Sequence, residues 1–386
     1  MSEPNDELYR NEHYKFGSEE QEKAEFREHV RRVREAQISL ADKHAPGHLR
    51  RVFHTKTHAC LTGKLNLLES RPESTRRGIF GSNGRTSYNV LARFSNGVGF
   101  DEHDLKPDVR GIGLKIFGVN DSSAGATGQM PRTVDFLMTN STNAFGKDQD
   151  EFVQFMEASV NPGVLDRNLL RFLLEREHRE VAKLLLKVTL RIVPSLAAEQ
   201  YWSGHPYLLG PDQAMKFNVR PSSDHEMEIE DGDLQEEMKT FKSGLDSIGD
   251  SIEHKIKHWL RMLKKSSSAV HPNYLSMDLL NRARRGPIKF IFSVQLEKDM
   301  ESTPIEDGLI EWKESDSPSI PVAELVLDRQ DKPQDCEDLR FTPGHRISDH
   351  RPLGNIGRGR IFTYEASQNG RHANPQEPGE SMFFGK

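Results

Sequence analysis

The sequence is poor in cysteine, in long apolar runs and in excess positive charge, and each shortage excludes a class of protein. Its two cysteines, Cys60 and Cys336, lie far apart and in no CxxC or similar ligand spacing. Neither a disulfide framework nor a cysteine zinc site is therefore expected. A reduced compartment fits this cysteine content best.

Charge and hydropathy argue against nucleic acid and membrane as partners. The chain has 53 Lys and Arg against 59 Asp and Glu, and the two signs are interspersed instead of forming a basic face. No uncharged run approaches the ~20 apolar residues of a membrane helix. The first residues, MSEPNDELYR, are polar and acidic where a secretory signal would be basic and then apolar. We expect a cytoplasmic protein without a membrane span.

Residues 1–48 are predicted to form a charged N-terminal arm or helix, because sparse apolar residues recur there at helical intervals. Residues 49–386 are predicted to form one barrel domain. Its first part consists of short β-rich runs punctuated by glycine, which is typical of strands in one sheet system. These runs are RVFHTKTHACLTGKLNLL (51–68), SYNVLARFSNG (87–97), VRGIGLKIFGV (109–119) and TVDFLMTN (133–140).

Later segments add both strands and helices. Ile288–Leu296 alternates apolar residues on one face, and Ala323–Leu327 has the pattern of a buried strand. Helical insertions are predicted near 147–190, where Arg167–Val188 is rich in leucine, and near 233–265. The acidic run 224–233 is expected to be an exposed loop. The fold class is therefore α+β, an antiparallel β-barrel with inserted helices.

Four histidines, His44, His48, His54 and His58, lie close together near the first predicted strand. The pair His54 and His58 lacks the glutamate of HExxH, and on a strand the two residues stand roughly 13 Å apart. A surface or structural role is the prediction for His44, His48 and His58. His54 differs because Arg51 precedes it, although an ordinary core histidine has the same pattern.

The C-terminal run GRGRIFTYEASQNGR places Arg360, Tyr364, Ser367 and Arg371 at spacings of four, three and four residues. If the segment is helical, all four share one face. A guanidinium near a phenol favours its ionised form, as a phenolate ligand to ferric iron requires. A surface helix with a tyrosine under two arginines fits the same spacing.

Together, and in this order, these segments resemble the haem catalase superfamily, and most closely its short catalase-related members. The resemblance extends from about residue 50 to residue 371 and implies the catalase core, with haem b buried between barrel and helices. It rests on RVFHTKT, ARFSNG, PDVRGIGLKIFG, DFLMTNSTNAF and the Arg-x-x-x-Tyr pair at Arg360 and Tyr364.

The resemblance also implies a role for each matching residue. Tyr364 is the expected iron ligand, with Arg360 as its charge partner. Above the haem, His54 is the expected acid-base residue, Ser95 orients it and Asn140 bonds the peroxide. The remaining assignments are the propionate arginines Arg51, Arg93 and Arg371, the haem-contacting rings Phe145 and Phe152, and Asp108 beside the access channel.

Departures from the family pattern leave the activity open. Phe53 stands where catalases have valine, Asn143 where they have proline, and the middle of the chain, 163–269, matches poorly. The leading expectation is a catalase-like haem peroxidase using hydrogen peroxide or organic hydroperoxides with a small-molecule electron donor. The alternatives are a fatty-acid hydroperoxide isomerase resembling allene oxide synthase and a non-catalytic haem-binding protein. A homo-oligomer is compatible with each.

Overall fold

The computed structural model describes residues 7–81, 85–119, 132–159, 168–222, 231–247, 251–264, 269–374 and 378–384. Its strands belong to one antiparallel sheet. They are β1 (Thr57–Leu67), β2 (Ser87–Asn96), β3 (Arg110–Val119), β4 (Arg132–Thr139), β5 (Tyr201–Trp202), β6 (Tyr207–Leu208), β7 (Ala214–Pro221), β8 (Ile288–Leu296) and β9 (Ile320–Leu327).

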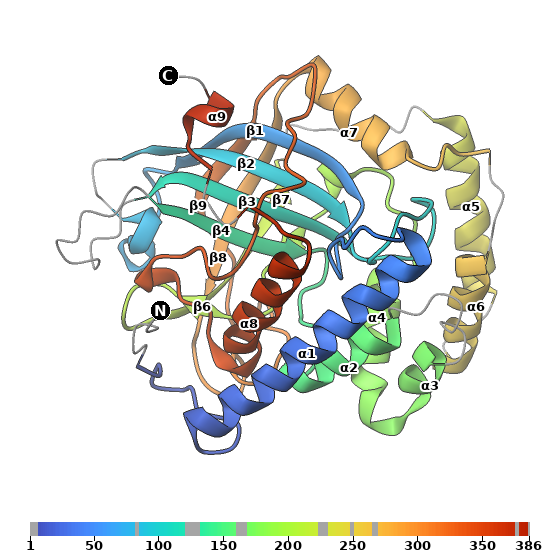
Figure 1. The fold of residues 1–386 in the computed structure, drawn as a ribbon. Helices are drawn as coiled ribbons and strands as arrows, with labels where there is room; N and C mark the ends of the chain where they lie inside the picture. Colours follow the sequence, from blue (N-terminus) through green and yellow to red (C-terminus); the bar gives the residue numbers. More distant parts are fainter. Residues whose placement is uncertain are drawn as a thin grey trace.

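The sheet closes into a barrel. Its nine strands follow the order β5-β4-β3-β2-β1-β9-β8-β7-β6, and β5 also pairs with β7. This extra pairing closes eight strands into a ring and leaves β6 outside it (Figure 1). Closure gives those strands a neighbour on both sides and so removes exposed edges. The predicted antiparallel barrel with helices is confirmed.

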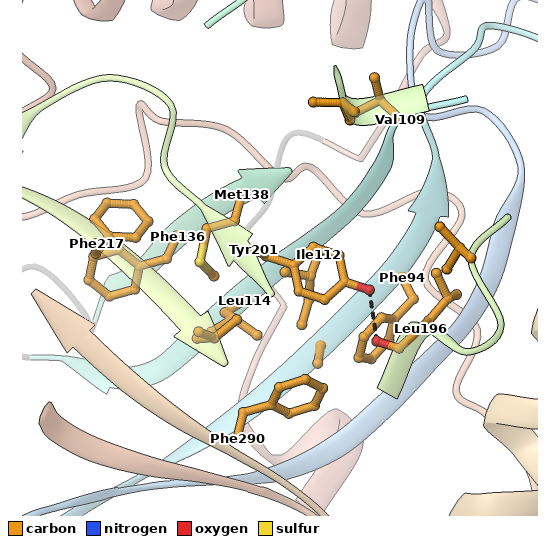
Figure 2. Close-up of a cluster of buried hydrophobic side chains, with 14 of the residues drawn as sticks. Phe94, Val109, Ile112, Leu114, Phe136, Met138, Leu196, Tyr201, Phe217 and Phe290 are labelled. Atoms are coloured by element: carbon orange, nitrogen blue, oxygen red, sulfur yellow. Dashed lines mark hydrogen bonds between the residues drawn. The ribbon is translucent and has the colours of Figure 1, made fainter. Parts of the chain in front are cut away.

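Apolar side chains fill the barrel interior. Phe94 from β2, Ile112 from β3, Phe136 from β4 and Phe290 from β8 converge there (Figure 2). Because side chains alternate along a strand, the neighbours of Phe94 face the outer side of the barrel. The outer face of β2 and β3 therefore carries the polar and small residues that build the site.

Helices cover this outer face and one side of the molecule (Figure 1). The packing of α1 on α8 and α2 makes the N-terminal helix part of the domain surface. The helices are α1 (Glu19–His44), α2 (Gln149–Ser159), α3 (Asn168–Leu174), α4 (Arg179–Thr189), α5 (Gly232–Asp246), α6 (Ile252–Lys264), α7 (Tyr274–Arg285), α8 (Gly354–Gly370) and α9 (Ser381–Phe384).

Local structure differs from the expectation at several points. The first strand begins at Thr57, so His54 precedes it instead of lying on it. The leucine-rich segment is not one helix, because the short 3-10 helix Arg176–His178 separates α3 from α4. Arg167, where this segment was predicted to begin, lies outside the described residues. Most of the acidic run 224–233 also lies outside them. The described helices are each too short or too polar to cross a lipid bilayer.

The expectation of two separate cysteines is wrong. Cys60 on β1 and Cys336 form a disulfide, with their Cα atoms 6.4 Å apart and a sequence separation of 276. Sequence spacing carries no information on this pair, because closure of the barrel and the return of the chain toward α8 bring the two residues together. The prediction of a reduced compartment loses the support it drew from unpaired cysteines.

Candidate functional site

A cavity of about 440 Å³ lies between the outer face of the barrel and the helices α2 and α8. Nearly all the residues proposed from the sequence line it. They are Arg51, His54, Arg93, Ser95, Asp108, Phe145, Phe152, Arg360, Tyr364 and Arg371. The structure therefore brings together segments that are more than 300 residues apart in the chain.

His54 reaches the cavity from the irregular segment before β1. Its backbone has φ 58°, a left-handed conformation that is costly for a residue other than glycine and recurs at functional sites. Its Nδ1 lies 3.1 Å from the Ser95 hydroxyl. Burial, and then the positive charges of Arg93 and Arg360, lower the pKa of His54 to about 3. The imidazole is therefore neutral near pH 7.

Gly111 on β3 makes room for this imidazole. A Cβ at position 111 would lie 2.6 Å from Cε1 and 2.7 Å from Nδ1 of His54. Real carbon atoms do not approach so closely, so the ring occupies its position because residue 111 has no side chain. Gly111 is thus a positioning residue for the histidine.

On the helix side, Tyr364 belongs to a short polar chain. The predicted helix is confirmed as α8, and Arg360, Tyr364 and Ser367 on it all face the cavity. Arg360 Nη2 donates to the Tyr364 hydroxyl at 2.9 Å, and Nη1 donates to Nδ1 of His205, also at 2.9 Å. Burial, and then Arg360, lower the pKa of His205 well below its usual range, so it accepts as a neutral ring.

Three arginines crowd one end of the cavity. Arg51 pairs with Glu337, and Arg371 donates to the backbone carbonyls of Glu337 and Leu339. Arg93 is 5% exposed and donates through Nη2 to the His54 carbonyl and the Thr57 hydroxyl. Burial, and then the charge of Arg51, lower the pKa of Arg93 well below its usual range and that of Arg371 to about 9.

The guanidinium groups of these three arginines fit an anionic group with two carboxylates. Within the described residues no carboxylate forms an ion pair with Arg93 or Arg371, and each has a buried Nε without an acceptor. Unpaired buried cations are costly, whereas guanidinium groups pair with carboxylates through two hydrogen bonds. The propionates of a haem have this chemistry, and Tyr364 offers an oxygen ligand in the same cavity.

Asn140 is the one predicted residue that the structure does not bring to the cavity. It follows β4, its Oδ1 accepts from the Arg110 backbone at 2.9 Å, and its Nδ2 donates to Glu199 at 3.0 Å. Both polar atoms of the amide are therefore engaged away from the described cavity lining. Asn143 is one of the amide side chains that do line the cavity; its Nδ2 donates to the Leu309 carbonyl, and its Oδ1 is buried without a partner.

Asp108 lies at the cavity wall, where its Oδ2 accepts from the backbone amides of Gly97 and Val98. Burial raises the pKa of Asp108 to about 6. This carboxyl is consequently fixed in place by the chain instead of being free to rotate. It suits the side of an access path better than a proton shuttle.

His205 and Gly111 are site residues that the sequence pattern did not predict. His205 lies next to Gly204, which has φ 74°, in a segment that matches the family poorly. No spacing links it to Arg360, which is 155 residues away. Gly111 could have been suspected from its place in the Asp-x-Arg-Gly run, although its contact with His54 depends on the tertiary fold.

Comparison with solved structures identifies this architecture as the catalase fold. A fungal catalase matches with a TM-score of 0.62 and 15% identity over 84% of this chain. Catalase A from Saccharomyces cerevisiae gives 0.60 and 14%, and a bacterial catalase 0.56 and 16%, each over 84% of the chain. The chain spans 60%, 62% and 58% of these three proteins.

Sequence comparison gives a more local result. The peroxisomal catalase of Toxoplasma gondii is 33% identical over 117 residues, which is 28% of this chain and 23% of that protein. No family model matches the chain. Fold and local sequence similarity are together consistent with a catalase-related superfamily member, as the motifs indicated.

Proposed function

We propose that the chain is a haem-dependent, peroxide-consuming oxidoreductase of the catalase or peroxidase type, acting on hydrogen peroxide or organic hydroperoxides. The observation that carries the proposal is one cavity containing both a tyrosine bonded to an arginine, Tyr364 and Arg360, and a neutral buried histidine, His54. The relatives named catalase support the same class of reaction.

Tyr364 would hold the iron of haem b, and Arg51, Arg93 and Arg371 its propionates. When bound, the haem supplies a redox-active iron for cleavage of the peroxide bond. Arg360 donates to the phenol oxygen and would hold it toward the iron. The neutral ring of His205 accepts from Arg360 and holds the guanidinium in position. Phe145 and Phe152 would contact the macrocycle by apolar packing.

His54 is the proposed proton shuttle. With Nδ1–H donating to Ser95, the Nε2 lone pair is free to take the proton of an incoming peroxide and return it to the leaving oxygen. Mere binding of haem would need no such group, which favours an enzyme over a carrier. A role for Asn140 in bonding the peroxide stays a prediction. In the structure its amide accepts from the Arg110 backbone and donates to Glu199.

Reduction of an organic hydroperoxide to an alcohol and water consumes two electrons, so this activity requires a donor. We expect a small-molecule reductant. Dismutation of hydrogen peroxide needs none, because one peroxide oxidises another to oxygen.

The test is an ultraviolet-visible spectrum of the purified protein, reconstituted with hemin and then treated with each peroxide. We expect a Soret band that changes within seconds of peroxide addition. A protein that takes up no hemin would refute the proposal. Donor-independent conversion of a fatty-acid hydroperoxide, without oxygen release, would instead identify an isomerase.

A further inference from the structure

The cavity includes a space lined by the helices α2, α3, α4 and α6. We call this part the helical arm, defined by Phe155, Ser159, Leu169, Leu185, Thr189 and Trp259. In Figure 1, α6 lies at the edge of the molecule, well away from α8, which carries Tyr364. The arm and the proposed iron ligand thus occupy different ends of one cavity.

The polar groups of the helical arm bond to each other or to their own helix. The Trp259 indole N–H donates to the Thr189 hydroxyl at 2.8 Å, and this hydroxyl donates to the Leu185 carbonyl at 2.7 Å. The Ser159 hydroxyl donates to the Phe155 carbonyl at 2.7 Å. The arm therefore offers its occupant methyl groups, methylene groups and aromatic rings, in contrast to the three arginines elsewhere in the cavity.

Most of the helical arm belongs to the part of the chain that least resembles the catalases. Leu169, Leu185, Thr189 and Trp259 all fall within residues 163–269, where the motif match is poor. These residues form part of the wall of the proposed active cavity. A change of wall residues can change which substrate binds, because loops and inserted helices can vary while the reacting residues stay the same.

We infer that the helical arm binds the hydrocarbon chain of an organic hydroperoxide, so that the hydroperoxide group lies toward His54. The inference rests on the proposed function, since it names the substrate class of the same cavity. Each methylene buried from water strengthens binding about fourfold. Hydrogen peroxide has no carbon and gains nothing from the arm, whereas an alkyl hydroperoxide gains with every carbon that the arm accommodates.

The test measures dissociation constants by calorimetry for unreactive primary alcohols from 1-butanol to 1-decanol, together with kcat/KM for the matching alkyl hydroperoxides and for hydrogen peroxide. For the wild-type protein we expect affinity to rise by about fourfold per methylene and then level off when the arm is full. A dissociation constant that does not change with chain length would overturn the inference.

Leu169→Trp should fill the arm. We expect the rise in affinity to stop at a shorter chain and decanol to bind at least tenfold more weakly. The matched control is Leu174→Trp on the same helix, because Leu174 is 51% exposed and does not line the cavity. Equal chain-length profiles in the two variants would overturn the inference.

Leu169→Ala is a second variant that tests the inference if Leu169→Trp misfolds. Thermal melts check that both variants are folded. Leu169→Ala should lengthen the arm, so that affinity levels off at a longer chain than in the wild type. The spectrum separates the two proposals. Absence of a Soret band refutes the haem function and with it the hydroperoxide, whereas a normal Soret band with affinity independent of chain length overturns the arm alone.

Discussion

Replacement of Gly111 by alanine tests the proposed proton shuttle without altering any polar group. The new methyl would lie 2.6 Å from Cε1 and 2.7 Å from Nδ1 of His54, and 3.3 Å from the Ser95 hydroxyl. Carbon atoms pack best at about 3.5–4.0 Å, so the imidazole must move by about 1 Å. A displacement of this size typically costs about 10²-fold in rate.

We therefore expect Gly111→Ala to bind hemin normally and to lose about 10²-fold in kcat/KM for hydrogen peroxide. The measurements are the initial rate of peroxide loss and the Soret absorbance per chain. The matched control is Gly286→Ala, because a Cβ at residue 286 would have no heavy atom within 4 Å. If Gly111→Ala turns over peroxide within twofold of that control, the assignment of His54 is wrong.

Three further predictions concern the tyrosine, the histidine of the cavity and the buried neutral imidazoles. Tyr364→Phe should abolish stable hemin binding, because no other anionic oxygen is proposed for the iron; an unchanged Soret spectrum would contradict this. His54→Ala should retain hemin and lose about 10²–10⁴-fold in peroxide turnover, measured at saturating hemin, and a wild-type rate would place the shuttle elsewhere. Unfolding by urea should become easier as the pH falls from 6.5 toward 4, because burial lowers the pKa of His54 to about 3 and that of His350 to about 4, while these residues in the unfolded chain bind protons near pH 6.5. Each would cost on the order of 1–2 kcal/mol at pH 5, and equal stability at pH 5 and pH 7.5 would refute the burial of neutral rings.

The spacing of residues along the sequence predicted the helices and strands that bury one face. The alternation in Ile288–Leu296 corresponds to β8, whose residues at even positions from Ile288 to Val294 are buried. The spacing of Arg360, Tyr364 and Ser367 placed them on one face of α8. Both predictions succeed because periodicity records which face meets the core.

Features that depend on tertiary contacts were not predictable from the same patterns. The strands β5 to β7 are short or lie in the poorly matching middle segment, so no alternation identified them. The positive φ of His54 has no local signature, since glycine is the residue that normally indicates it. Asn140 was placed by motif alone, whereas the direction of its amide depends on Glu199, which is 59 residues away.

The disulfide between Cys60 and Cys336 bears on how the cavity is assembled. Cys336 directly precedes Glu337, and the chain from Glu337 to Leu339 supplies the acceptors that hold Arg51 and Arg371. By joining this segment to β1, the bond restricts its motion before any ligand arrives. An anionic group entering the cavity therefore meets arginines that are already ordered, and the entropy of fixing them is lost during oxidative folding instead of during binding. Assembly of the cavity is in this sense coupled to thiol chemistry on the outer wall of the barrel.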